Sequence, residues 1–215
     1  MRAAFTSEEP LARAESASEQ NRSLGRRESM FALALHASLF FAAPEASIRV
    51  RVARHSGGVS IAGPLNCGTK KTGTHRFKRR GAELAADGQR VRTGKCAGQG
   101  SFNYQGLRWN GRVEVRVHRG AVIVVAHVAL ERYVAGVVSA ELPAGWPPAA
   151  LEAMAVAARS YALFRAGQAR KKPYDVTADA NGQGFRGDSA TRRPARRAAA
   201  ATAGQVLRSG GKPAA

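Results

Sequence analysis

The chain has 215 residues, enough for one domain with a sizeable core or for a small module beside a larger one. Its formal net charge is +19, from 34 Lys and Arg against 15 Asp and Glu, so a partner attracted to its surface should be anionic. Because the basic residues are scattered and not interleaved with aromatic residues, we expect no nucleic-acid partner.

The first 46 residues are predicted to lie outside the folded part. Residues 1–28 are rich in Ser, Glu, Arg and Gln, which indicates a disordered start or a gene start placed too far upstream. Arg26 and Arg27 then precede the apolar run 30–43, which has the length of a signal-peptide core and is too short to span a membrane. An amphipathic or buried helix is the alternative. We favour export to the periplasm or cell envelope, with cleavage after Ala46 and no stable membrane span.

Residues 48–110 are predicted to form a small β-rich module. Alternation of apolar and charged residues between Gly-rich turns predicts its short strands, near 48–52, 59–61, 90–92 and 102–107. Two segments rich in Lys, Thr, Arg or Gly, 66–80 and 94–100, are predicted to be loops.

The two cysteines of the chain, Cys67 and Cys96, fall in this module. In an exported protein such a pair forms a disulfide more often than it remains as two thiols, whereas in a cytosolic protein both would be buried thiols. Two cysteines without histidine partners or C-x-x-C spacing do not make a structural zinc site. We therefore expect no metal, and since the sequence has no P-loop and no dinucleotide-binding fingerprint, we expect no cofactor.

A hairpin and a helix follow, and they lead to a chemically useful side chain. Alternating valines at 113–117, a turn at 118–120 and an apolar run at 121–128 predict two antiparallel strands. His127, beside this apolar run, is expected to be structural. An apolar stripe with helical spacing, from Leu130 to Val138, then predicts a helix that stops before Pro143.

One more turn of this stripe leads to Glu141, which is therefore predicted to face inward at the end of its helix. Partial burial and the partial negative charge of a helix C-terminus both disfavour an ionised carboxylate. A carboxyl that keeps its proton near neutral pH is what a general acid requires. The alternative is a helix-end residue turned to solvent.

A second helix is predicted after the Pro- and Gly-rich joint 143–148. Its apolar face runs from Leu151 to Ala162 and indicates ordinary core packing. Arg159 lies at the edge of this face, where it could pair with a carboxylate or contact a ligand.

The remaining elements complete an α+β fold with an antiparallel β-rich N-terminal module, followed by a hairpin and helices packed on short strands. After the second helix we expect, in order, a basic loop at 167–173, a strand at 174–177, a turn region at 179–187, an Ala-rich helix at 190–203 with a solvated arginine face, and the start of a strand at 205–207.

Residues 111–213 resemble the core signature of the stage II sporulation protein D / amidase enhancer family. The first helix carries the pattern of that family at Tyr133, Gly136 and Glu141, and the second contains the run AVAARSYAL at 155–163. The family block downstream corresponds to Asp179 to Gly187, with Phe185 in place of the usual Tyr and Gly182 where many members have Cys. Met154 also departs from the family, which often has a polar residue there.

The resemblance implies a lytic transglycosylase that cleaves β-1,4 links of peptidoglycan strands free of stem peptides. One residue, at the position of Glu141, protonates the bridging oxygen and then acts as base, while a hydroxyl of the sugar closes a 1,6-anhydro ring. Further residues would contact or position the sugars: Arg159, Tyr161, Gln183 and Phe185. For the last two, a Gly-rich surface loop is the alternative.

Other members of the family are regarded as enhancers of cell-wall amidases. A non-catalytic wall-binding module, with an amidase as its possible partner, is therefore the second hypothesis. Members continue beyond a Gly-Lys-Pro such as 211–213 into a strand and a Ser/Gly-rich segment that helps build the cleft. On that pattern residues 111–215 are expected to be a domain without its C-terminal half, which leaves open whether the chain is an enzyme.

Overall fold

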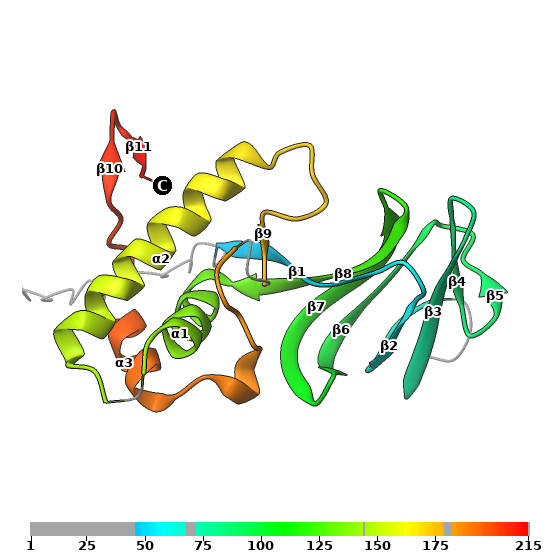
Figure 1. Ribbon diagram of the computed structural model, residues 1–215, viewed down its shortest axis with the longest axis horizontal. Helices are drawn as coiled ribbons and strands as arrows, with labels where there is room; N and C mark the ends of the chain where they lie inside the picture. The colour runs from blue at the N-terminus through cyan, green and yellow to red at the C-terminus, as the bar shows by residue number, and fades with distance from the viewer. Residues whose placement is uncertain (1–45, 68–71, 144, 179–181, 215) are drawn as a thin grey trace, which may run out of the picture. The chain divides into compact units, whose positions relative to one another are not determined.

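The computed structural model describes residues 46–67, 72–143, 145–178 and 182–214, so the predicted disordered start and signal peptide lie outside the described residues. The fold is α+β, as predicted, with a large sheet and three α-helices in this part (Figure 1). None of these helices is long and apolar enough to span a bilayer.

Nine strands of the described chain form one sheet, in the order β5-β4-β3-β2-β6-β7-β8-β1-β9. Neighbouring strands are antiparallel except β1 and β9, which are parallel. The strands are β1 (Ser47–His55), β2 (Val59–Ala62), β3 (Thr74–Arg80), β4 (Glu83–Ala86), β5 (Gln89–Arg90), β6 (Lys95–Tyr104), β7 (Leu107–His118), β8 (Ala121–Ala129) and β9 (Val176–Thr177). A separate hairpin consists of β10 (Arg208–Ser209) and β11 (Lys212–Pro213).

The sheet continues across the domain boundary predicted between residues 110 and 111. β7 contains this boundary, and it pairs with β6 on one side and with β8 on the other. β1, at the start of the predicted N-terminal module, pairs with β8 of the predicted second domain. The two predicted units therefore share one sheet.

Two segments predicted as loops, 66–80 and 94–100, contain strands, since β3 occupies the second half of the first and β6 most of the second. In β3, His75 and Phe77 are buried, while Arg76 between them and Lys78 after them are exposed. The apolar alternation of this strand is weak in the sequence, because one of the two buried members is a histidine and the exposed members are charged. In β6, a Cβ on Gly98 would lie 1.8 Å from the carbonyl oxygen of Pro64, so this glycine allows the backbone of the segment after β2 to approach the sheet closely.

Cys67 and Cys96 are joined by a disulfide, with their Cα atoms 4.9 Å apart. Cys96 is fully buried in β6. Beside the bond, the backbone N–H of Asn66 donates to the carbonyl oxygen of Ala97 at 2.9 Å. Together these contacts attach the segment between β2 and β3 to β6.

The helices are α1 (Leu130–Glu141), α2 (Pro148–Gln168) and α3 (Arg193–Ala201), and a short 3-10 helix, η1 (Asp188–Ala190), precedes α3. α1 follows β8 without a loop, and its buried face contains the predicted stripe from Leu130 to Val138. α2 buries small residues such as Ala155 and Ala158, which permits close packing of the three helices against one another. The Ala-rich helix predicted at 190–203 is thus the shorter α3.

Candidate functional site around Glu141

The end of α1 and the segment 182–187 surround a depression that contains the Glu141 carboxylate. Its volume is about 390 Å³, and its lining consists of Ala140, Glu141, Ala178, Gly182, Gly184, Phe185 and Arg186. The backbone N–H of Gly184 donates to Oε1 of Glu141 at 2.6 Å. The structure therefore brings the predicted catalytic residue together with residues 182–187 of the predicted sugar-contacting block, more than 40 positions away in the sequence, while residues 179–181 of that block lie outside the described residues.

Two glycines allow these segments to approach one another. A Cβ on Gly136 of α1 would lie 2.6 Å from ring atoms of Phe185, and a Cβ on Gly184 would lie 2.9 Å from Oε1 of Glu141. Both distances are shorter than a normal carbon contact. Any side chain at these positions would push the 182–187 segment or the carboxylate away.

A tyrosine of α1 supports the same segment. The Tyr133 hydroxyl donates to the side-chain oxygen of Gln183 at 3.0 Å, and the Tyr133 and Phe185 rings have centroids 5.5 Å apart. Burial raises the pKa of Tyr133 far above its usual range, and the neighbouring Tyr161 and Glu141 act in the same direction. The hydroxyl therefore stays protonated and keeps donating to Gln183.

Glu141 is exposed and does not face inward as predicted. The buried stripe of α1 ends at Val138, after which Ser139 is half-buried and Ala140 is exposed. The helix thus extends beyond the core by one turn, and the apolar spacing was extrapolated too far. The prediction that the Glu141 carboxyl keeps its proton depends on burial, and without a ligand over the site this burial is absent.

Residues 118–208 match the model of the family named SpoIID, which is described as a stage II sporulation protein. This segment belongs to the SpoIID family. It contains β8, all three helices, and the depression around Glu141, and the family indicates a sporulation role connected with the cell wall.

A relative of this chain is an uncharacterized protein of Brachyspira hyodysenteriae, which is 38% identical over 79 residues. The matched region is 36% of this chain and 22% of that protein, so the chain spans about a fifth of the length of the relative. No solved structure matches the chain.

Two residues of the SpoIID domain that were predicted to contact sugars are buried. Phe185 is 3% exposed and packs on α1, so its ring supports the site from within and does not reach a ligand. Arg159 is fully buried, and its guanidinium donates to both carboxylate oxygens of Glu131 at 2.8 and 2.6 Å. Of the two roles considered for Arg159, the structure shows the ion pair, and the complete burial excludes direct ligand contact. Gln183 and Tyr161 are half-buried.

Arg192 was not predicted as a site residue, yet it fixes the end of α1. Its backbone N–H donates to Oγ of Ser139 at 2.9 Å, and its guanidinium donates to the carbonyl oxygens of Ser139, at 2.6 Å, and of Leu142. A cation at these carbonyl groups satisfies the helix C-terminus that carries Glu141. Sequence spacing offers no signal for this contact because the partners are 50 and 53 positions apart.

A second depression of the SpoIID domain, of about 470 Å³, lies between the start of α2 and α3, and Trp146 is part of its lining. Trp146 is 49% exposed, which is high for a large apolar side chain. Its backbone N–H donates to the carbonyl oxygen of Pro143 at 3.4 Å and closes a turn after α1. Consecutive Cα atoms are about 3.8 Å apart, and the two ends of a turn are less than about 7 Å apart. Glu141 and Trp146 are separated by two such steps and this turn, so their Cα atoms lie within about 15 Å of each other.

No group of three or more His, Cys, Asp or Glu side chains is placed to hold a metal ion in the described ranges. The polar groups near Glu141 are instead the backbone N–H of Gly184, the Gln183 amide held by a tyrosine hydroxyl, and the exposed Arg186, which lines the depression. Groups of these kinds can orient a carboxylate and donate to, or accept from, the hydroxyl groups of a ligand.

Gly184→Ala is expected to impair the site without unfolding the domain. The new Cβ would lie 2.9 Å from Oε1 of Glu141 and 3.0 Å from Cβ of Ala140, so the flexible carboxylate should move and lose its hydrogen bond. A misplaced reacting group can lower a rate about 100-fold. Two measurements on the variant check this prediction: the rate of glycan cleavage, which is the activity that the family resemblance implies, and the melting temperature. A large fall in melting temperature with proportional loss of product would contradict a local effect.

Proposed function

We propose that this SpoIID domain is a lytic transglycosylase that cleaves β-1,4 glycosidic links of peptidoglycan glycan strands, with Glu141 as its single acid and base. The observation that carries the proposal is the position of the Glu141 carboxylate, which lies in a depression and is held by the Gly184 N–H through Oε1. No hydrogen bond to Oε2 is found in the described part of the chain, so this oxygen is open to a sugar.

In the proposed reaction, protonated Glu141 gives its proton to the bridging oxygen as the bond from that oxygen to C1 breaks. The carboxylate then accepts the proton of the C6 hydroxyl while O6 bonds to C1 and closes a 1,6-anhydro ring. Because no water is consumed, one carboxyl group suffices where hydrolases use two. A glycan lying over the depression would exclude water and so supply the desolvation that the uncovered site lacks.

The half-buried Gln183 and Tyr161 are the candidates for positioning sugars. Gln183 is held by Tyr133, so its orientation is fixed before a ligand arrives. The guanidinium of Arg165 lies over the Tyr161 ring, 5.7 Å from its centroid. In this proposal the partners are glycan strands, and the protein acts after export in the cell envelope.

A non-catalytic function is the second candidate: the domain binds the wall and enhances an amidase. The exposure of Glu141 favours it, because an exposed carboxylate beside a backbone N–H also suits a polar binding surface. This function requires no proton transfer.

Mass spectrometry of stem-peptide-free glycan strands incubated with the full chain separates the two functions. Transglycosylation gives fragments with 1,6-anhydro ends. Binding to purified sacculi without such fragments would favour the wall-binding function. Failure both to bind and to cleave would contradict both proposals.

Trp146→Ala is expected to weaken binding of a glycan oligosaccharide about 5- to 30-fold, which corresponds to about 1–2 kcal/mol for an aromatic contact. Calorimetric titration of both proteins gives the affinities. In the wild type, a ligand-dependent change in tryptophan fluorescence should come from Trp146, since Trp109 is 3% exposed. Leu207→Ala is the matched control, because Leu207 is 53% exposed and does not line this depression. Equal affinity of wild type and Trp146→Ala would exclude a sugar contact at Trp146.

A further inference from the structure

We propose that the exposed face of β3 binds a linear phosphodiester polymer of the cell envelope that carries no bases. This surface, called the β3 face below, consists of the side chains of Arg76, Lys78 and Arg80. It belongs to the part of the sheet before the SpoIID domain, and the proposal does not depend on the activity of Glu141.

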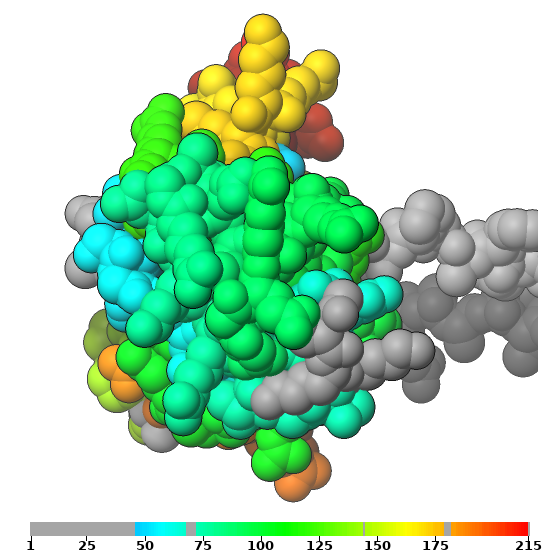
Figure 2. Space-filling model, turned by 90° about the vertical axis from the view of Figure 1, so that its right-hand side faces the viewer, coloured from blue at the N-terminus to red at the C-terminus, as the bar shows by residue number. Residues whose placement is uncertain are grey.

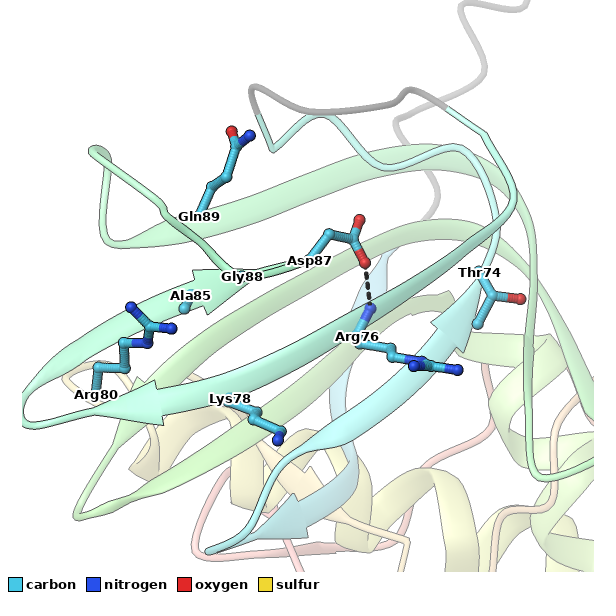
Figure 3. A pocket seen from close by; sticks show the side chains of 8 residues that line it. All are labelled: Thr74, Arg76, Lys78, Arg80, Ala85, Asp87, Gly88 and Gln89. Atoms are coloured by element: carbon cyan, nitrogen blue, oxygen red, sulfur yellow. Dashed lines mark hydrogen bonds between the residues drawn. The ribbon is translucent and has the colours of Figure 1, made fainter.

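The three cations of the β3 face are arranged in a row. They occupy alternate positions of one strand, so they point to the same side, and all three are exposed. Alternate residues of a strand are about 6.7 Å apart. Figure 3 shows the row along β3, with Asp87 and Gly88 in the turn after β4 and Gln89 at the start of β5.

The surface beside this row is hollowed. A concavity of about 760 Å³ is lined by Thr74, Arg76, Lys78, Arg80, Ala85, Asp87, Gly88 and Gln89. Small residues provide the space, since Lys78 is paired in the sheet with Ala85 and the turn contains Gly88. Figure 2 views the molecule from the side on which β3, β4 and β5 lie, where these strands are drawn in teal.

The positive charge of the β3 face is not cancelled by ion pairs. In the described ranges, none of its three side chains forms a salt bridge. Of the nearby carboxylates, Glu83 pairs with Arg90, and Asp87 accepts the backbone N–H of Arg76 at 2.9 Å. Asp87 also lies 3.3 Å from Nδ1 of the buried His75.

A phosphodiester chain fits the spacing and the chemistry of this row. The cations are two residues apart, and two residues of an extended peptide contain about six backbone bonds. In a polymer that joins its phosphates through three-carbon units, one repeat also contains about six bonds, so its phosphates have a similar spacing. Such a polymer can therefore place one phosphate near each cation. Arginine binds phosphate through two parallel N–H groups, and lysine acts as a point charge.

The lining of the concavity argues against a nucleic acid, whose backbone has a similar repeat. Proteins that bind single strands stack the bases on aromatic side chains. Among the described residues that line the concavity, none is aromatic. A polymer without bases needs only the cations. A glycerol-phosphate chain has this chemistry.

The test is binding of the full chain to immobilised poly(glycerol phosphate) over a range of salt concentrations. The variant replaces the β3 face by R76Q, K78Q and R80Q, and the matched control removes three charges from the exposed segment 170–172 by R170Q, K171Q and K172Q. Each phosphate contact adds about 0.7 to the slope of log affinity against log salt for a single-stranded polyanion. The β3 variant should therefore lower this slope by about 2, and the control should leave it nearly unchanged.

Three outcomes would overturn the proposal. The first is an equal fall in slope for the two variants, which would indicate diffuse attraction by the net charge. The second is no binding of poly(glycerol phosphate) by the wild type. The third is tighter binding of single-stranded DNA of equal charge, lost in the β3 variant, which would identify a nucleic-acid surface. Because the substituted side chains are exposed, circular dichroism should show unchanged folding in both variants.

Discussion

Glu141→Gln is expected to abolish the 1,6-anhydro product while leaving the fold intact. The amide keeps the size of the side chain and an oxygen that can accept the Gly184 N–H, but it can neither give a proton to the bridging oxygen nor take one from the C6 hydroxyl. General acid and base catalysis contributes about 100- to 10,000-fold to a rate. Product formation from stem-peptide-free strands, followed by mass spectrometry, should fall by that order.

Measurements of stability and of oligosaccharide affinity distinguish a loss of catalysis from unfolding and from a loss of binding. Because Glu141 is exposed, its substitution should change the free energy of unfolding by less than about 0.5 kcal/mol. The affinity for an oligosaccharide should change much less than the rate. Glu83→Gln is the matched control, since Glu83 is an exposed carboxylate of β4 outside the depression. Equal product from wild type and Glu141→Gln would remove Glu141 from the mechanism and leave the wall-binding function.

The parts of the fold that could be predicted are those whose pattern is local. The stripe of α1 and the alternating valines of β7 are repeated in a short window. The helix lies where it was expected, and β7 contains the expected strand 113–117 but begins earlier, at Leu107. β3 was missed although its alternation is equally regular, because its buried members are His75 and Phe77 and its exposed members are strongly basic. Alternation of exposed and buried residues with a period of two indicates a strand even where the exposed members are charged.

The family resemblance predicts which segments meet at the candidate site, but not which of their side chains are exposed. The family signature placed Glu141 and the block with Gln183 in one site, and the structure brings them together. Whether a side chain at a helix end is covered depends on where the neighbouring elements stop, which no local pattern records. The same reason explains Arg192, whose cap on α1 depends on the path of the chain between two helices.

Arg159→Met is expected to lower the free energy of unfolding by about 3 kcal/mol or more. Removing one partner of a buried ion pair costs about 3–5 kcal/mol, and Glu131 is 32% exposed, so water can recover part of the loss on its side. The carbonyl oxygens of Ala199 and Gln205 would also lose the donor that they share. For a chain of this length the melting temperature should fall by roughly 6–12 °C.

Glu131→Gln is the matched control, because its amide oxygen can still accept from Arg159 and its side chain still reaches water. Its cost should be well below that of Arg159→Met, and urea unfolding of both variants measures the difference. Costs of equal size would mean that the ion pair, and not the bonds from Arg159 to the backbone of α3 and the segment that follows it, holds the helices together.

Arg159 and Arg192 contact opposite ends of α1. Arg159 pairs with Glu131 in the first turn of the helix, and Arg192 donates to the carbonyl oxygen of Ser139 in the last turn. Arg159→Met should therefore loosen the first turn before it affects the Glu141 end, which Arg192 still caps. Hydrogen exchange of the α1 amides should be measured in the variant and in the wild type under native conditions. The increase in exchange rate caused by the substitution should be larger in the packed first half of α1 than in its last turn. Uniformly faster exchange along α1 would mean that the helix opens as one unit, and that the position of Glu141 depends on Arg159 as well.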